Sequence, residues 1–326
     1  MENKMGNTMI EIEFCLPRSI RVKITSRCQY RCKFCHQEGY FNSNDVGTKE
    51  LLRAVKILRE ELGLYRLHFT GGEPTLLDEF LRLLKIAKQL GFVNSLTTNG
   101  QFQLESLPKF KIAGLDSINF SLHTLNASAF LNLQDIPVTA TNLKWAKNCI
   151  CRTIENAKAA NNLIETKINC VVGKDRASAQ SILEFCIKNK IKLRFLNDLT
   201  LGRMAVETIQ EILLERKTKL VRNEITLLSS SHRLDYQVRL YQFGVKCIRK
   251  FFLKSLCENC KLKKNNRCLE GFYGIRLEGD PLMVRLCLNR NGTPFVQPFD
   301  LFMESKQFKE FKEKRQTISE YLSMEE

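Results

Sequence analysis

The first two thirds of the chain alternate between strand patterns and helical patterns. Short apolar, β-branched runs predict strands at 20–25, 64–70, 93–97, 117–122, 166–172 and 192–196. Helical spacing of apolar residues falls at 49–62, 76–90, 149–161 and 179–188. Because repeated strand–helix units form a parallel sheet covered by helices, we expect an α/β fold, a partial (β/α)6 TIM-like barrel.

Three segments are expected along the chain. Residues 1–19 form an N-terminal segment and residues 20–200 form the barrel. The alternation fades after residue 200, although a helix is expected near 206–216. Residues 201–326 are therefore predicted to be a C-terminal extension, which is rich in cysteine and in basic residues.

The charge balance favours an anionic partner. Lys and Arg number 51 against 35 Asp and Glu, which gives a net charge of +16. Eight cations lie between Gly244 and Cys268 against one acid, Glu258. A nucleotide, a phosphorylated metabolite or a nucleic acid would fit such an excess, and so would a merely basic, soluble surface.

Composition excludes several classes of protein. With 44% hydrophobic and 26% charged residues, the chain is typical of a globular enzyme and not of a disordered or collagen-like one. No apolar run approaches the ~20 residues of a membrane helix, so no membrane partner is expected. The first residues lack the apolar segment of a secretory signal, so we expect a cytoplasmic protein.

Special residues follow the predicted strands. Cys28 comes after the first strand, Gly71 after the second and Asn99 after the third, and Ser121 lies at the fourth. The carboxyl ends of parallel strands meet at one mouth of a barrel. The sequence therefore predicts an active site at that mouth.

Cys28, Cys32 and Cys35 place three thiols within eight residues. Such thiols bind iron–sulfur clusters or zinc, and three ligands on a four-iron cluster leave one iron open for catalysis. Zinc would need a fourth ligand, and His36, next to Cys35, is awkwardly placed for it. A redox pair of Cys32 and Cys35 would leave Cys28 unexplained.

This cysteine motif, with Phe34 before its last member, resembles that of the radical S-adenosylmethionine (SAM) superfamily. The segments 69–74 (FTGGEP), 96–100 and 119–122 resemble the superfamily's SAM-contacting strand ends. The resemblance implies a [4Fe-4S] cluster on the three cysteines, SAM, and an electron donor such as flavodoxin or ferredoxin. It also implies that SAM is cleaved to a 5′-deoxyadenosyl radical that abstracts hydrogen from a substrate.

The resemblance places SAM contacts at eight positions. Glu73 could also be an ordinary carboxylate at a helix N-terminus. The expected SAM-binding residues are Gly71, Gly72, Glu73, Pro74, Thr98, Asn99, Ser121 and Lys167.

Within the superfamily the chain is most similar to the GTP cyclase family of molybdenum cofactor biosynthesis. The segments 21–28 (RVKITSRC), 166–172 (TKINCVV) and 193–196 (LRFL) carry this similarity. It implies that Arg21 and Arg194 contact substrate and that Lys167 contacts SAM or substrate, with Arg66 at a further basic position. An anionic small molecule, a nucleotide or a phosphorylated compound, is the expected substrate, and a buried cation needs such a partner. Surface exposure is the ordinary alternative for each of these cations.

A second cysteine group lies in the extension. The family binds a second cluster through three cysteines there, and this chain has an insertion that adds another. Iron–sulfur is favoured over zinc, which the same ligands could also hold. The expected ligands of this second [4Fe-4S] cluster are Cys257, Cys260, Cys268 and Cys287.

Three departures argue against GTP as the substrate. His68 and His123 replace an arginine and an aspartate of the family, and Gly274 replaces an arginine. A peptide maturase with an auxiliary cluster is the main alternative, followed by an RNA-modifying or nucleic-acid-binding iron–sulfur protein. Nucleic acid is not favoured, because the basic segment has few aromatic residues, Phe251 and Phe252.

Overall fold

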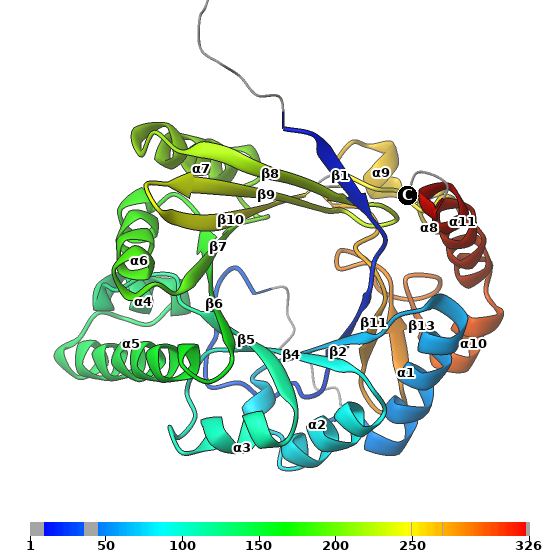
Figure 1. The fold of residues 1–326 in the computed structure, drawn as a ribbon, viewed down its shortest axis with the longest axis horizontal. Helices are drawn as coiled ribbons and strands as arrows, with labels where there is room; N and C mark the ends of the chain where they lie inside the picture. Colours follow the sequence, from blue (N-terminus) through cyan, green and yellow to red (C-terminus); the bar gives the residue numbers. More distant parts are fainter. Residues whose placement is uncertain (1–9, 36–44, 249, 269, 324–326) are drawn as a thin grey trace, which may run out of the picture.

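A computed structural model describes the chain over residues 10–35, 45–248, 250–268 and 270–323. All the strands that it assigns belong to one curled sheet of thirteen, which encloses a central space (Figure 1). The order across the sheet is β1-β8-β9-β10-β7-β6-β5-β4-β3-β2-β11-β12-β13.

Six consecutive parallel strands form the middle of this sheet, so the predicted partial barrel is confirmed. Each lies within two or three residues of its predicted range. They are β2 (Ser19–Lys23), β3 (Arg66–Thr70), β4 (Val93–Thr98), β5 (Leu115–Ser121), β6 (Glu165–Val172) and β7 (Lys192–Asn197).

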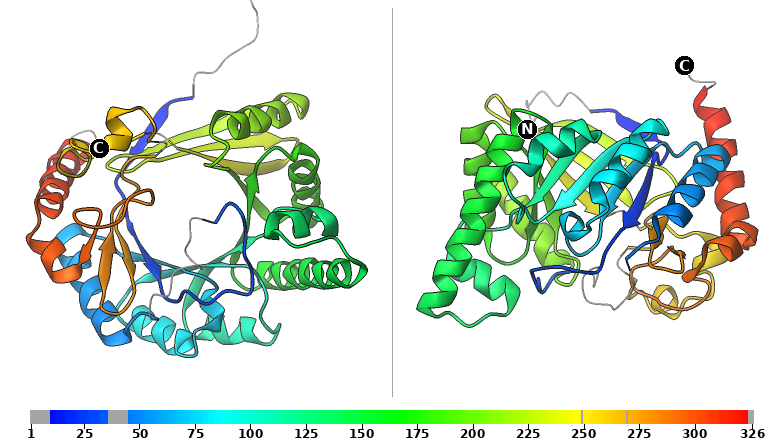
Figure 2. Two further views of the ribbon diagram at one scale, coloured as in Figure 1. Left: turned by 180° about the vertical axis from the view of Figure 1, so that it is seen from behind. Right: turned by 90° about the horizontal axis from the view of Figure 1, so that it is seen from below.

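Helices cover the outside of the barrel (Figure 2). The long helix α5 (Ala140–Asn161) begins nine residues before its predicted start, because Thr139 caps it by accepting a hydrogen bond from the Asn142 N–H. The predicted helix 76–90 is instead a 3-10 turn, η1 (Pro74–Leu76), followed by α2 (Phe80–Gln89). The other helices of the barrel are α1 (Thr48–Leu62), α3 (Ser106–Ile112), α4 (Ala127–Gln134), α6 (Arg176–Asn189) and α7 (Arg203–Glu215), of which α3 and α4 were not predicted.

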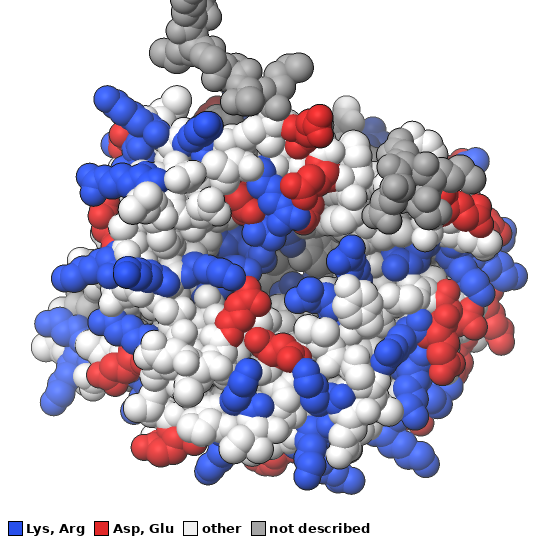
Figure 3. All heavy atoms as spheres, in the orientation of Figure 1, with Lys and Arg blue, Asp and Glu red and all other residues white. Residues whose placement is uncertain are grey.

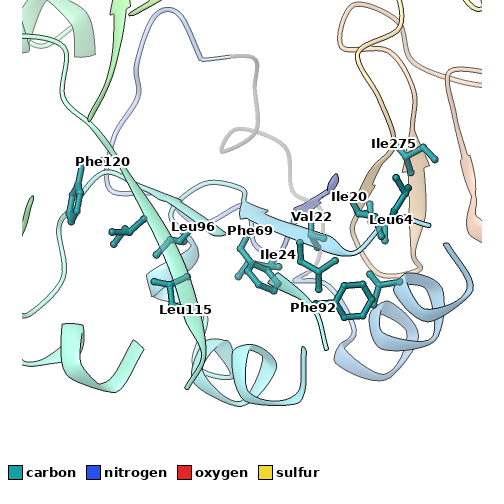
Figure 4. Close-up of a cluster of buried hydrophobic side chains, with 14 of the residues drawn as sticks. Ile20, Val22, Ile24, Leu64, Phe69, Phe92, Leu96, Leu115, Phe120 and Ile275 are labelled. Carbon is teal, nitrogen blue, oxygen red and sulfur yellow. The ribbon is translucent and has the colours of Figure 1, made fainter. Parts of the chain in front are cut away.

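The hydrophobic core lies between the strands and the helices. Phe69, Leu96 and Ile118 are fully buried on the outer face of their strands, and Figure 4 shows Phe69 and Leu96 directed toward the helices. Because side chains alternate along a strand, the residues between them face the barrel interior. Those positions carry polar and charged side chains, such as His68, Thr97 and Asn119.

The extension enlarges the same sheet at both ends. Strands β8 (Lys219–Thr226), β9 (Ser231–Val238) and β10 (Tyr241–Ile248) form an antiparallel unit, and β10 pairs parallel with β7. On the other side β11 (Arg276–Glu278) pairs with β2 and is followed by β12 (Met283–Arg285) and β13 (Val296–Pro298). The boundary near residue 200 stays a prediction, since the sheet runs through it.

The N-terminal segment connects one edge of the sheet to the parallel strands. Strand β1 (Ile12–Cys15) pairs parallel with β8 at that edge, and the chain then runs directly into β2, which lies between β3 and β11 (Figure 1). Four helices complete the extension: α8 (Lys254–Cys257), α9 (Lys261–Lys264), α10 (Phe299–Glu304) and α11 (Lys306–Ser323). None of the helices in the described ranges has the length and apolar character needed to cross a bilayer.

Candidate active site

The two glycines after β3 lie against the segment that leads to the first cysteines. The Gly72 N–H donates to the Thr25 carbonyl (2.8 Å), and the Glu73 N–H donates to the Arg27 carbonyl (2.6 Å). A Cβ on Gly71 would lie 2.3 Å from the Thr25 oxygen, and one on Gly72 would lie 2.1 Å from the Arg27 oxygen. Only glycine permits this approach, so these residues anchor the start of the cysteine loop.

Glu73 joins the ends of β3 and β4. Its carboxylate is fully buried and accepts hydrogen bonds from the hydroxyl of Thr98 (2.8 Å) and the N–H of Asn99 (2.6 Å), as well as from the N–H and hydroxyl of Thr75. Burial raises its pKa, while these donors act in the opposite direction. Pro74 is buried at the start of η1. The predicted SAM residues of the two strands thus form one hydrogen-bonded unit.

The first three cysteines lie together above this unit. Cys28, Cys32 and Cys35 are half-buried and close enough to act electrostatically on one another. Cys32 Sγ accepts from Gln134 Nε2 (3.0 Å), and the Cys28 Sγ accepts from the Tyr30 N–H (3.4 Å). The convergence of three thiols at a strand end fits a [4Fe-4S] cluster with one open iron.

Without a metal Cys28 and Cys32 are thiols. Burial raises the pKa of Cys28 to about 11 and that of Cys32 to about 12, so a metal must displace their protons when it binds. His36, considered above as a zinc ligand, lies outside the described residues. Asn99 links the loop to β4, because its side-chain amide donates to Gln29 Oε1 (2.9 Å).

A cavity of about 400 Å³ adjoins the cysteine loop at the ends of β5, β6 and β7. Phe34, His123, Val171 and Leu201 are among its lining residues. The His123 Nδ1 accepts the Val171 N–H (3.0 Å), and its ring packs edge-to-face on Phe34 at 4.7 Å. Burial lowers the pKa of His123 to about 4, so its ring is uncharged near neutral pH.

Ser121 ends β5 at the same mouth, in register with Asn169 of β6. Arg66, by contrast, is the first residue of β3, at the opposite end of the strand from Gly71. It is close enough to Glu165, the first residue of β6, to lower the pKa of that carboxyl together with Lys192 and Lys167. Arg66 therefore lies at the amino mouth of the barrel, away from the cysteines.

The other predicted cations face the interior. Lys167 and Arg194 are half-buried, on the inward positions of β6 and β7. Burial, and then repulsion by Arg194 and Arg233, lowers the pKa of Lys167 to about 7. Burial and Arg233 likewise lower the pKa of Arg194. Within the described ranges neither Lys167 nor Arg194 has an ion pair or a side-chain hydrogen bond, although Asp235 and Glu224 lie close enough to act electrostatically on Arg194.

The extension contributes interior residues that the sequence did not indicate. The ring of Tyr273 lies 4.3 Å from Lys246 Nζ and 5.9 Å from Arg21 Cζ, and the Tyr273 hydroxyl contacts Lys246. Burial raises the pKa of Tyr273, but Lys246 and Arg21 outweigh burial and bring it to about 7. Figure 3 shows Lys and Arg gathered around a central hollow. In this part of the chain, only the alternation of polar residues at 231–237 could have suggested a strand that faces the interior, and that segment is β9.

The second cysteine group is also brought together. All four side chains are at most 7% exposed: Cys257, Cys260, Cys268 and Cys287. Burial raises the pKa of Cys257 to about 12, and the three neighbouring cysteines contribute to this shift. No three His, Cys, Asp or Glu side chains of the described residues are arranged in coordinating geometry. Four neighbouring buried thiols are of the chemical type that binds an iron–sulfur cluster or a zinc ion.

Comparison with known proteins gives related sequences. A probable GTP 3′,8-cyclase of Saccharolobus solfataricus is 32% identical over 193 residues, 57% of this chain and 59% of that protein. The chain thus matches less than two thirds of that relative's length. A probable GTP 3′,8-cyclase of Sulfurisphaera tokodaii is 29% identical over 251 residues, 74% of this chain and 75% of the relative.

Solved structures share the fold. The structure of Streptococcus suis SuiB bound to S-adenosylmethionine superposes with a TM-score of 0.59 at 16% identity, over 90% of this chain and 67% of SuiB. That of native anSMEcpe with bound AdoMet has a TM-score of 0.55 at 15% identity, over 90% and 82% of the two chains. At such identities the likeness supports the fold alone.

The model of the radical SAM superfamily matches residues 22–186, half of the chain, and covers the first cysteine group and the strand ends around it. The chain therefore belongs to the radical SAM superfamily and is a radical SAM enzyme.

Proposed function

We propose that this enzyme cleaves SAM reductively at a cluster held by Cys28, Cys32 and Cys35, and abstracts hydrogen from an anionic small molecule bound inside the barrel. The observation that carries the substrate class is the pair Lys167 and Arg194, which face the interior and form no ion pair in the described structure. A phosphorylated or nucleotide substrate would supply an anionic partner for both.

The family implies a [4Fe-4S] cluster and SAM as cofactors. When bound, the cluster supplies one electron to SAM and so generates the 5′-deoxyadenosyl radical. We assign the three cysteines as its ligands and the ends of β3 and β4 as the seat of SAM. Glu73 then acts as a positioning residue, because its carboxylate already holds Thr98 and the N–H of Asn99.

We further assign the adenosyl part of SAM to the cavity beside Phe34. Its volume of about 400 Å³ suits a ligand of that size, and its aromatic and aliphatic wall suits a purine ring. His123 supports this assignment, since its ring is neutral near pH 7 and packs on Phe34. This wall would also exclude water from the reacting atoms.

GTP itself is a weaker candidate than another anion. His68 replaces a family arginine, and its two ring nitrogens lie 2.7 Å from Ser95 Oγ and 2.9 Å from Thr97 Oγ1. A ring held between two hydroxyls is poorly placed to bind phosphate. Tyr273 and Lys246 of the extension instead add polar groups that a substrate would meet.

Anaerobic reconstitution and measurement of 5′-deoxyadenosine from SAM test the reaction. The variant with Cys28, Cys32 and Cys35 all replaced by Ala should form none, while Cys151→Ala, at an exposed cysteine of α5, should match the wild type. The same triple variant tests the second centre. About four irons retained per chain would support a second [4Fe-4S] cluster, retained zinc would support the structural alternative, and no metal would contradict both.

Thermal shifts with GTP, pyrophosphate and guanosine test the substrate class. The two anions should raise the melting temperature, and Lys167→Met with Arg194→Met should abolish that rise. Guanosine should give little change. If none of the anions binds, the peptide maturase becomes the better proposal. We place the enzyme in the cytoplasm, where an electron donor such as flavodoxin or ferredoxin is available.

A further inference from the structure

Lys246 brings a cation of the extension to the carboxyl mouth of the barrel. On β10 it is in register with Leu196 of β7, which in turn pairs with Val171 of β6. Val171 is one of the residues that line the cavity of about 400 Å³. Lys167 pairs with the first residue of β7, so it lies nearer the amino mouth. Lys246 is therefore closer than Lys167 to the end of the barrel at which the cysteine loop lies.

The half-buried side chain of Tyr273 lies among cations of the interior. Its hydroxyl contacts the Nζ of Lys246, which has no ion pair in the part of the chain that the structure describes. The Arg21 guanidinium lies 5.9 Å from the centre of its ring, and Arg194 is close enough to act electrostatically on the phenol. Glu270, from the preceding loop, is an acid that also acts on it. Cations of β2, β7 and β10 thus meet at one phenol oxygen.

The loop that carries Tyr273 is held in place without this hydroxyl. The Tyr273 carbonyl accepts from the Ser229 hydroxyl (2.8 Å), and the Phe272 carbonyl accepts from the Ser230 N–H (3.1 Å). Phe272 is only 1% exposed and packs into the core. At Gly274, where the family has an arginine, an added Cβ would meet no described atom within 4 Å. Open space therefore adjoins Tyr273, and its hydroxyl is free for a role other than fixing the loop.

We propose that Lys246 and Arg21 form a second anion subsite, in which the Tyr273 hydroxyl takes the place of the anion until a phosphate or carboxylate group of the ligand displaces it from Lys246. This inference rests on the proposed function, because the same ligand would place another anionic group on Lys167 and Arg194. It narrows the substrate class to compounds that carry two separated anionic groups.

Binding at this subsite is coupled to the uptake of a proton. Burial raises the pKa of Tyr273, but Lys246 and Arg21 outweigh burial and bring it to about 7. An anion on Lys246 neutralises the charge that stabilises the phenolate, so the Tyr273 oxygen takes one proton from water and becomes a hydroxyl. Since the anion and the phenolate compete, the affinity for the anion should fall by about tenfold per pH unit above pH 7.

Calorimetry with pyrophosphate at pH 6 and pH 8 tests this competition on the full-length, reconstituted protein. Tyr65→Phe is the matched control for Tyr273→Phe, because Tyr65 directly precedes β3 at the amino mouth. From pH 6 to pH 8, the wild type and the control should lose about tenfold more affinity than Tyr273→Phe. The titration of pyrophosphate itself is common to all three proteins and cancels in this comparison. Lys246→Met, which keeps Tyr273, should bind pyrophosphate more weakly than the wild type at pH 6.

Ultraviolet absorbance supplies a second readout that is independent of activity. At pH 8, saturating pyrophosphate should remove the phenolate absorbance that the wild type has and Tyr273→Phe lacks. Binding that leaves this absorbance unchanged, equal pH dependence in the two proteins, or unchanged affinity in Lys246→Met would each overturn the inference and leave the proposed function standing. If pyrophosphate binds neither the wild type nor Tyr273→Phe at either pH, the proposed anion site itself is wrong, and the inference with it.

Discussion

Gly72→Ala tests how the glycine pair anchors the cysteine loop. The new Cβ would lie 2.1 Å from the Arg27 carbonyl oxygen, 2.6 Å from the Arg27 carbonyl carbon and 2.8 Å from the Ser26 oxygen. All three are backbone atoms, so no side chain can rotate away. The two segments must separate by about 1 Å to reach ordinary contact distance.

That separation has a predictable cost. It stretches the hydrogen bonds from the Gly72 N–H to Thr25 and from the Glu73 N–H to Arg27 beyond hydrogen-bonding length. Losing two hydrogen bonds of about 0.5–1.5 kcal/mol each, with buried groups left unpaired, should lower the free energy of unfolding by about 2–4 kcal/mol. Because Arg27 precedes Cys28, the variant should also take up less iron at the first cluster.

Urea denaturation of the metal-free protein and iron analysis after reconstitution measure these effects. Gly47→Ala is the matched control, since Gly47 has φ −67° and an added Cβ meets only Asp280 at 3.5 Å. As Gly47 is the N-cap of α1, that change should cost about 1 kcal/mol or less. If Gly72→Ala proves as stable as Gly47→Ala and loads iron fully, the inferred anchoring is wrong.

Three further predictions concern charged and polar groups. Because the pKa of Lys167 is about 7 in the folded protein, the unfolded chain binds more protons than the folded chain above that pH, and the free energy of unfolding should increase from pH 7 to 10. Lys167→Met should remove this increase. In thermal unfolding at each pH, the variant should raise the melting temperature most at pH 6. The difference in ultraviolet absorbance between wild type and Tyr273→Phe should show a phenolate appearing near pH 7, and titration near pH 10 would contradict the geometry around Lys246. Glu73→Gln places an amide NH₂ group against the N–H and O–H donors that the carboxylate now accepts from, and should lower the free energy of unfolding in urea by about 1–3 kcal/mol. Glu79→Gln, at an exposed carboxylate, should lower it far less.

Local patterns were enough to predict the centre of the fold and which residues share one mouth of it. The apolar runs of β2 to β7 alternate with helices, and in a parallel sheet that alternation determines which residues share a mouth. Cys28, Gly71 and Asn99 could be placed together on that basis alone. The family match and the sheet order bear out this part of the prediction.

The role of the glycine pair could not be predicted in the same way. The resemblance predicted SAM contacts at Gly71 and Gly72, and the structure shows in addition that their backbone lies against Thr25 and Arg27 of the same chain. Which backbone lies opposite a glycine depends on how two loops pack. That information is tertiary, and no spacing within either loop contains it.

The pairing of β1 with β8 and the charged interior were decided only by tertiary structure. Strand β1 pairs with β8 across about two hundred residues, Ile12 facing Asn223, and no local signal records such a pairing. Strand β9 alternates Leu234, Tyr236 and Val238 with the polar residues Arg233, Asp235 and Gln237, but nothing in that pattern says which strands lie beside it. From the sequence alone it was possible to identify the cysteine groups, the strand ends and the cations Lys167 and Arg194 as candidate site residues. Arg194 also lies near Tyr273, and Lys246, which contacts Tyr273, is placed beside β7 by the long-range pairing of β10 with β7, which only the folded chain shows.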